Sequence, residues 1–121
     1  MKAKELLAEL TYVGQAEGLR QTYDVFRGKR YYIVISFSRS KRRSGNFNIV
    51  DPGAVQDARK SFAGQHGVTS TVLKKRLQRM GRTTEALEAL NILYVLVAMK
   101  AAHVDRRLSQ RELFFDLTLA S

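Results

Sequence analysis

The sequence predicts an α+β domain, with a three-stranded antiparallel sheet in its first half and a helical second half. Short runs rich in β-branched and aromatic residues occur between residues 22 and 50, which is typical of strands. From residue 51 onward the apolar residues recur mostly at helical spacing. A chain of 121 residues, 45% of them hydrophobic, can close one core, so we expect a single domain over residues 1–121.

The first segment, residues 3–18, is expected to be an amphipathic helix that ends at Gly18. Its apolar residues recur at helical spacing, whereas its charged residues fall on the other side. The N-terminus has no small-residue cleavage site of the kind that signal peptides carry. No apolar run in the chain reaches the roughly 18 to 20 residues that a membrane span needs. We therefore expect an intracellular protein with no membrane partner.

Three strands are expected next, at residues 22–26, 30–37 and 46–50. The first two are separated by Arg27, Gly28 and Lys29, a short Gly-containing turn that suits a hairpin. The second connection, residues 38–45, contains four cations in a short polar loop. The sequence thus predicts an antiparallel meander whose second connection is strongly basic.

Two helices with clear start signals follow the strands. Asp51 can cap the first, Pro52 suits its first turn, and Gly64 can end it. The second restarts after Gly67 with Thr69 or Ser70 as its cap. This order over residues 53–80 is consistent with a helix-turn-helix, whose second helix enters the major groove of DNA. Two ordinary core helices with a charged outer face are the alternative interpretation.

A third helix is expected at Thr84–Ala102, apolar on more than one face. It is either the central helix of the domain or the contact of a homodimer. The residues after it allow two interpretations. Val104 and residues 113–115 would make two strands of a wing that turns at Arg106, whereas residues 109–112 form a capping box that favours a fourth helix. The helix is the interpretation we prefer.

Cationic side chains outnumber acidic ones, with 21 Lys and Arg against 11 Asp and Glu and a formal net charge of +10. Such an excess is typical of proteins that bind nucleic acid, because Lys and Arg neutralise phosphates and release counterions. The cations gather at the hairpin turn, in the basic connection and on the second helix, where hydroxyl and amide groups would add hydrogen bonds. The candidate contact residues are Arg27, Lys29, Arg30, Arg39, Lys41, Arg42, Arg43, Asn46, Thr69, Ser70, Thr71, Lys74, Lys75, Arg79 and Arg82.

Double-stranded DNA is the expected partner, which would place the protein in the cytoplasm, the nucleoid or the nucleus. The same charge permits an RNA-binding or ribosome-associated protein. Tyr31, Tyr32 and Phe47 lie beside the cations in the sequence and would stack on exposed bases in that case. The alternation of faces along a strand instead places at least half of these aromatic residues in the core.

The sequence predicts no catalytic site, no metal and no cofactor. There is no Cys, and His66 and His103 are far apart in the sequence. Asp24 and the apolar strand after it are superficially similar to the strand layout of PD-(D/E)xK nucleases. Ser36 stands where the Glu-x-Lys of that site is needed, so a catalytically incomplete nuclease-like subunit is a further alternative.

The stretch from Leu87 to Phe115 contains a helical segment and then the motif Ser-Gln-Arg-Glu-Leu-Phe-Phe at residues 109–115. It resembles the winged-helix segment of type IIB topoisomerase A subunits and of the related meiotic double-strand-break protein. In that family a Ser/Thr-x-Arg-Glu/Asp-x-Tyr/Phe-Tyr motif bears the catalytic Tyr. Phe115 takes the position of this Tyr, and a phenyl ring cannot attack a phosphodiester. The resemblance implies a winged-helix relative that binds DNA without cutting it.

Overall fold

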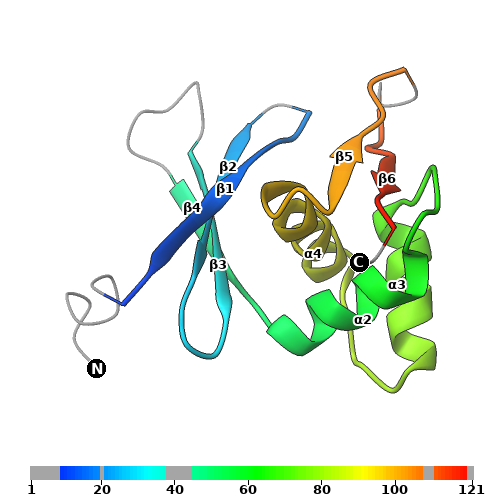
Figure 1. Ribbon diagram of the computed structural model, residues 1–121, viewed down its shortest axis with the longest axis horizontal. Coiled ribbons are helices and arrows are strands. Elements are labelled where there is room, and N and C mark those ends of the chain that lie inside the picture. The colour runs from blue at the N-terminus through cyan, green and yellow to red at the C-terminus, as the bar shows by residue number, and fades with distance from the viewer. Residues whose placement is uncertain (1–8, 20, 38–44, 108–110, 120–121) are drawn as a thin grey trace.

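The computed structural model describes residues 9–19, 21–37, 45–107 and 111–119, and these form a mixed α+β domain (Figure 1). The elements in chain order are β1 (Thr11–Glu17), β2 (Thr22–Arg27), β3 (Tyr32–Phe37), β4 (Gly45–Val50), α2 (Pro52–Phe62), α3 (Ser70–Arg79), α4 (Ala86–Ala98), β5 (Ala102–Val104) and β6 (Phe115–Leu117). The first four strands form one antiparallel sheet in the order β1-β2-β3-β4, and β5 pairs with β6. The α+β class is confirmed, but the main sheet has four strands where the sequence predicted three.

The additional strand, β1, occupies residues for which the sequence predicted a helix, so that prediction is wrong for residues 11–17. The part of the predicted helix at residues 3–8 lies outside the described residues. The physical reason is close packing at Gly14, where a Cβ atom would lie 2.5 Å from the carbonyl oxygen of Ala98. The β1 backbone thus passes directly against the end of α4, and tertiary packing overrides the local apolar spacing.

The other three strands lie where the sequence predicted them. In their ladder Val25 pairs with Val34, and Val34 pairs with Asn48. Val25 and Val34 are buried in the core, and α4 contacts all four strands, so this row of side chains faces α4. Because side chains alternate along a strand, Ser36 shares the face of Val34. The inner face of the sheet is therefore apolar in the middle and polar where β3 ends.

The helices α2 and α3 begin at the predicted caps. The Asp51 carboxylate accepts a hydrogen bond from the Gly53 N–H at 3.1 Å, and the Thr69 hydroxyl accepts one from the Val72 N–H at 3.2 Å. Both side chains satisfy N–H groups that the first turn of a helix leaves unpaired. Gly64 follows α2 with a φ of +75°, a conformation that favours glycine.

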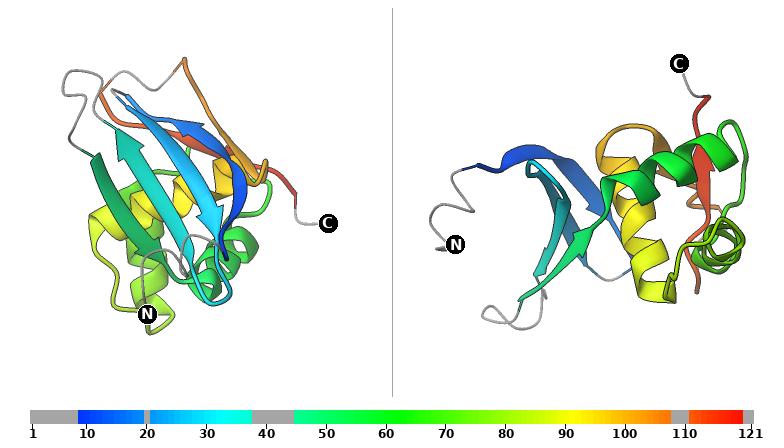
Figure 2. Two further views of the ribbon diagram at one scale, coloured as in Figure 1. Left: turned by 90° about the vertical axis from the view of Figure 1, so that its left-hand side faces the viewer. Right: turned by 90° about the horizontal axis from the view of Figure 1, so that it is seen from below.

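The helix α4 is the centre of the domain. It lies between the four-stranded sheet on one side and α2 and α3 on the other (Figure 2). Its buried residues are Ala89, Asn91, Ile92, Leu93, Tyr94, Val95, Leu96 and Ala98. One chain therefore covers most of the apolar side chains that suggested a homodimer through Thr84–Ala102, whereas Leu87 stays exposed. None of the helices in the described part of the chain is long and apolar enough to cross a membrane.

The chain after α4 forms strands, so the preferred interpretation of a fourth helix is wrong for residues 111–117; residues 108–110 lie outside the described part. The helix α4 ends at Ala98, earlier than predicted, and Lys100 adopts a φ of 64° before β5 begins. Phe115 exchanges two backbone hydrogen bonds of 2.8 Å with Val68, and its side chain is fully buried. These long-range contacts outweigh the local capping box.

Candidate nucleic-acid interface

The turn between β2 and β3 presents two exposed cations, Lys29 and Arg30. Lys29 Nζ lies 3.8 Å from the Glu9 carboxylate, and both side chains are exposed, so water screens this pair and leaves it weak. Arg27 is engaged differently, because its guanidinium carbon lies 4.7 Å from the centroid of the Tyr32 ring. The turn therefore offers an anion two cations rather than the three that the sequence suggested.

The connection between β3 and β4 contains four predicted contact residues that lie outside the described part of the chain: Arg39, Lys41, Arg42 and Arg43. Its two ends are described, because the ladder of β3 and β4 pairs Phe37 with Gly45. Asn46, a further predicted contact, is the second residue of β4 and pairs with Ser36. Since β3 runs between the two connections, this one leaves the sheet at the end opposite to the β2–β3 turn.

The helix α3 is strongly cationic and carries no carboxylate. Its cations are Lys74, Lys75, Arg76 and Arg79. Within the described residues, none of these four forms an ion pair with a carboxylate. Sequence reasoning missed Arg76, which lies 5.1 Å from the Phe62 ring and is exposed. The run of three consecutive cations at residues 74–76 was the signal that would have found it.

The hydroxyl residues at the start of α3 differ in what they offer. Thr69 is buried and caps the helix, so its hydroxyl is already used. Ser70 is half-buried, and Thr71 is exposed on the same helix as the cations. Thr71 is therefore the hydroxyl best placed to reach a partner.

Arg82 does not belong to the α3 surface, because the helix ends at Arg79. Its Nε lies 2.6 Å from Asp57 Oδ2 and its Nη1 lies 2.8 Å from Asp51 Oδ2. The hydrogen bond to Asp57 is the largest cause that raises the pKa of Arg82. Two carboxylates thus hold this guanidinium, and its role in the structure is to join the start of α2 to the end of α3.

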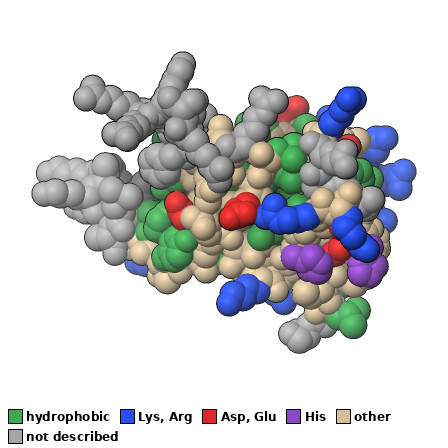
Figure 3. Space-filling model, turned by 90° about the horizontal axis from the view of Figure 1, so that it is seen from above, with side chains coloured by type: hydrophobic (Ala, Val, Ile, Leu, Met, Phe, Trp, Pro, Cys, Tyr) green, Lys and Arg blue, Asp and Glu red, His purple; other side chains and the backbone are tan. Residues whose placement is uncertain are grey.

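Among the described residues, the predicted cations form separate groups rather than one surface. Those of the β2–β3 turn belong to the sheet, and α4 lies between the sheet and α3 (Figure 1). On the face drawn in Figure 3, most of the described Lys and Arg side chains lie over the half of the molecule that holds the helices and the β5–β6 pair.

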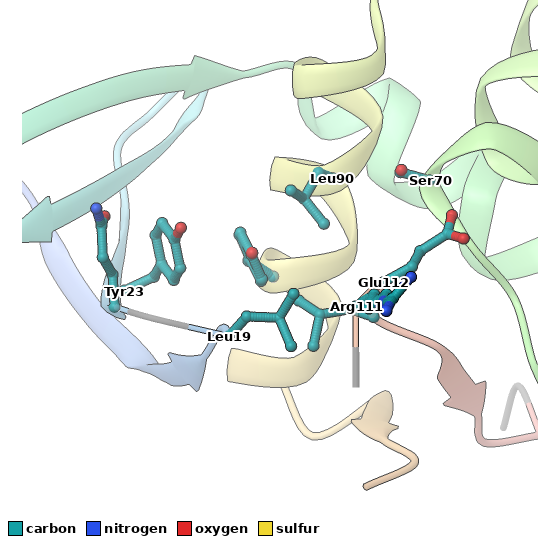
Figure 4. A pocket seen from close by; sticks show the side chains of 9 residues that line it. Leu19, Tyr23, Ser70, Leu90, Arg111 and Glu112 are labelled. Carbon is teal, nitrogen blue, oxygen red and sulfur yellow. The ribbon is translucent and has the colours of Figure 1, made fainter. Parts of the chain in front are cut away.

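Two adjoining cavities lie over one face of α4, and sequence reasoning missed both. They share Gln21, Tyr23 and Tyr94. The first, of about 490 Å³, is bounded by Leu90 on one side and by Arg111 on the other (Figure 4). The second, of about 480 Å³, lies where β3 ends and β4 begins. We call the second one the amide cavity after its three carboxamides, Gln21, Asn48 and Asn91.

The aromatic residues considered for base stacking have different surroundings. The Tyr32 hydroxyl lies 3.7 Å from Met99 Sδ, and the Tyr31 ring packs beside Gly28. Phe47 is 68% exposed. Of the three, Phe47 alone presents most of its ring to a partner.

Two histidines meet at one buried carboxylate. His66 Nδ1 and His103 Nε2 each lie 3.4 Å from a different oxygen of Asp116, and Figure 3 shows the two imidazoles next to each other. Asp116 also accepts a 2.9 Å hydrogen bond from the Gly67 N–H. This carboxylate therefore ties the loop before α3 to β6.

Asp24, on which the nuclease interpretation rested, accepts a 3.0 Å hydrogen bond from the Tyr12 hydroxyl. Within the described residues, no group of three or more His, Cys, Asp or Glu side chains is arranged to hold a metal ion.

Comparisons with protein-family models, with curated proteins and with solved structures found no match to this chain.

Proposed function

We propose that this protein is a non-enzymatic DNA-binding module that contacts duplex DNA through the exposed face of α3 and the β3–β4 connection. The observation that carries the proposal is the charge of α3, which has four cations and no carboxylate. Elsewhere in the described chain many carboxylates have cationic partners: Asp51 and Asp57 hold Arg82, and Asp105 holds Arg107. The α3 cations are left for phosphates.

The order of elements supports a winged-helix character for the second half. The chain passes through α2, a bridge at Val68, α3, α4, β5 and β6, and Val68 and β5 both pair with β6. In a winged helix the third helix commonly reads the major groove. Here that helix is α4, and the sheet covers it. We therefore assign the DNA contact to α3, whose predicted contacts Thr71, Lys75 and Arg79 are exposed.

The salt dependence of binding tests this function. Fluorescence anisotropy with a labelled duplex of about 20 base pairs should show an affinity that falls by several logs between about 50 and 200 mM salt, if six or more phosphates are contacted. Unlabelled duplex DNA should compete better than structured RNA of equal length and charge. A flat salt response would refute the proposal, and stronger competition by RNA would assign the surface to RNA instead.

A further inference from the structure

The amide cavity opens between the inner face of the sheet and the N-terminal half of α4. None of the described residues that line it is charged, and its wall combines carboxamides with the aromatic rings of Tyr23 and Tyr94. At about 480 Å³ its volume falls in the range of small-ligand sites. Such a wall favours a flat, uncharged ligand that has hydrogen-bonding groups along its edge.

Asn91, in the wall of the cavity, has a side-chain oxygen without a hydrogen-bond partner among the described residues. This residue is 1% exposed, and its Nδ2 donates a 2.9 Å hydrogen bond to the Leu87 carbonyl. That bond fixes the orientation of the amide and leaves Oδ1 buried, with no partner among the described residues. A buried acceptor without a partner costs about 1–3 kcal/mol, so a polar atom of this kind in a core helix calls for an explanation. Asn91 is one of the residues that line the cavity, so a donor bound there would pair with Oδ1 once the side chain turns to expose that atom.

The aromatic part of the wall is preorganised. The rings of Tyr23 and Tyr94 stack with centroids 4.0 Å apart, and Tyr94 is held in the core. Amide side chains recognise base edges through paired donors and acceptors, while aromatic rings and bases associate through their faces. An extended apolar peptide would leave the three carboxamides without such partners.

We propose that the amide cavity receives one unpaired nucleobase of a nucleic acid that is bound to the cationic face of α3. This inference rests on the proposed function, because the net charge of +10 is what would attract the phosphates. Ser70, the first residue of α3, lines the adjoining cavity, which shares Gln21, Tyr23 and Tyr94 with the amide cavity, so the helix of the proposed phosphate contacts reaches the neighbouring wall. Asn91 would accept a hydrogen bond from an amino or imino group of the base.

The test compares three labelled DNA probes of one sequence at one salt concentration: a perfect duplex, the duplex with one unpaired adenine, and the duplex with an abasic spacer in place of that adenine. The abasic probe keeps the bulge and removes only the base. We expect the adenine bulge to bind at least about fivefold more tightly than the abasic bulge. Equal affinities for these two probes would overturn the cavity proposal and leave DNA binding intact, whereas no binding to any probe would refute both proposals.

Substitutions locate the effect. Asn91→Leu keeps the side-chain volume and removes the acceptor, and Asn48→Ala removes a carboxamide from the opposite wall; each should abolish the preference for adenine without changing the affinity for the perfect duplex. Gln15→Ala is the matched control, because Gln15 is an exposed amide on the same sheet that does not line the cavity. Asn91→Leu should not lower the melting temperature, since it also removes the unpaired acceptor. Self-association that Asn48→Ala abolishes, together with no preference for adenine, would assign the cavity to a second copy of the chain and overturn the proposal.

Discussion

The ring of Tyr23 lies nearly parallel to that of Tyr94, with an angle of 19° between the planes. Burial, and then the hydrogen bond between the two hydroxyl groups, raise the pKa of Tyr94 far above its ordinary value near 10. The folded protein thus holds Tyr94 in its neutral form, whereas the unfolded chain ionises it at the ordinary pKa. The stability that Tyr94 contributes is fully present below about pH 10 and declines as the pH rises above it.

We predict that Tyr94→Phe weakens this alkaline loss of stability, because Phe cannot ionise. Thermal unfolding at pH 8, 10 and 11 should show a smaller decline in the melting temperature for the variant than for the wild type. Lysine deprotonation affects both proteins alike, so the comparison isolates Tyr94. Identical declines in the two proteins would show that Tyr94 does not control the alkaline response.

The four cations of the β3–β4 connection can be tested together. We predict that replacing Arg39, Lys41, Arg42 and Arg43 by Ala weakens duplex binding and reduces the slope of log affinity against log salt by up to about 3–4, because each phosphate contact contributes about 0.9. The melting temperature should stay nearly constant, because the sequence predicts that these cations lie in a polar connection between strands, where charges add little to folding.

The matched control for this variant is Lys29→Ala with Arg30→Ala, at the other end of β3. This pair removes two charges rather than four, so the two variants are compared per charge removed, and the pair should change the affinity and the salt slope less on that basis. If both variants weaken binding equally per charge removed, charge alone determines affinity and the proposed contact is misplaced.

How far the sequence predicts this molecule depends on the range of the interactions involved. The caps at Asp51 and Thr69 form between neighbouring residues, so their chemistry can be read directly, and α2 and α3 begin where predicted. β1 instead depends on the contact of Gly14 with Ala98, and β6 depends on the pairing of Phe115 with Val68. These contacts join residues far apart in the sequence, which a local pattern does not contain.

In the candidate site, too, the features that depend on neighbouring residues were predictable, and those that depend on residues far apart in the sequence were not. The charge of α3 was predictable, because helical spacing places Lys75 and Arg79 together. The ion pairs of Arg82 with Asp51 and Asp57 join residues about 25 to 31 positions apart, so Arg82 was counted as a free cation. The amide cavity needs three strands and a helix, and its only local signal was a polar Asn91 within an apolar helix.

Arg82 and the α3 cations should respond differently to removal. We predict that Arg82→Ala lowers the free energy of unfolding by about 1 kcal/mol, because it breaks two ion pairs that are partly exposed, and that it changes DNA affinity little. The triple replacement of Lys74, Lys75 and Arg79 by Ala should lower the DNA affinity strongly and change the free energy of unfolding little. Urea unfolding measures the free energy of unfolding, and anisotropy on the same samples measures the DNA affinity. A large loss of affinity in Arg82→Ala would show that Arg82 contacts DNA after all.

The homodimer through Thr84–Ala102 stays a prediction, and α4 offers a matched pair of leucines to test it. Leu93 is fully buried, whereas Leu87 is 60% exposed on the same helix. Leu93→Asp should unfold the chain in either case, because an unpaired carboxylate in the core costs several kcal/mol. Leu87→Asp should stay folded, and it should convert a dimer into a monomer only if two copies meet at this helix. Sedimentation at about micromolar concentration measures the outcome: a wild type that sediments as a monomer, with Leu87→Asp unchanged, would rule out this dimer and leave α4 solely as the central helix of one chain.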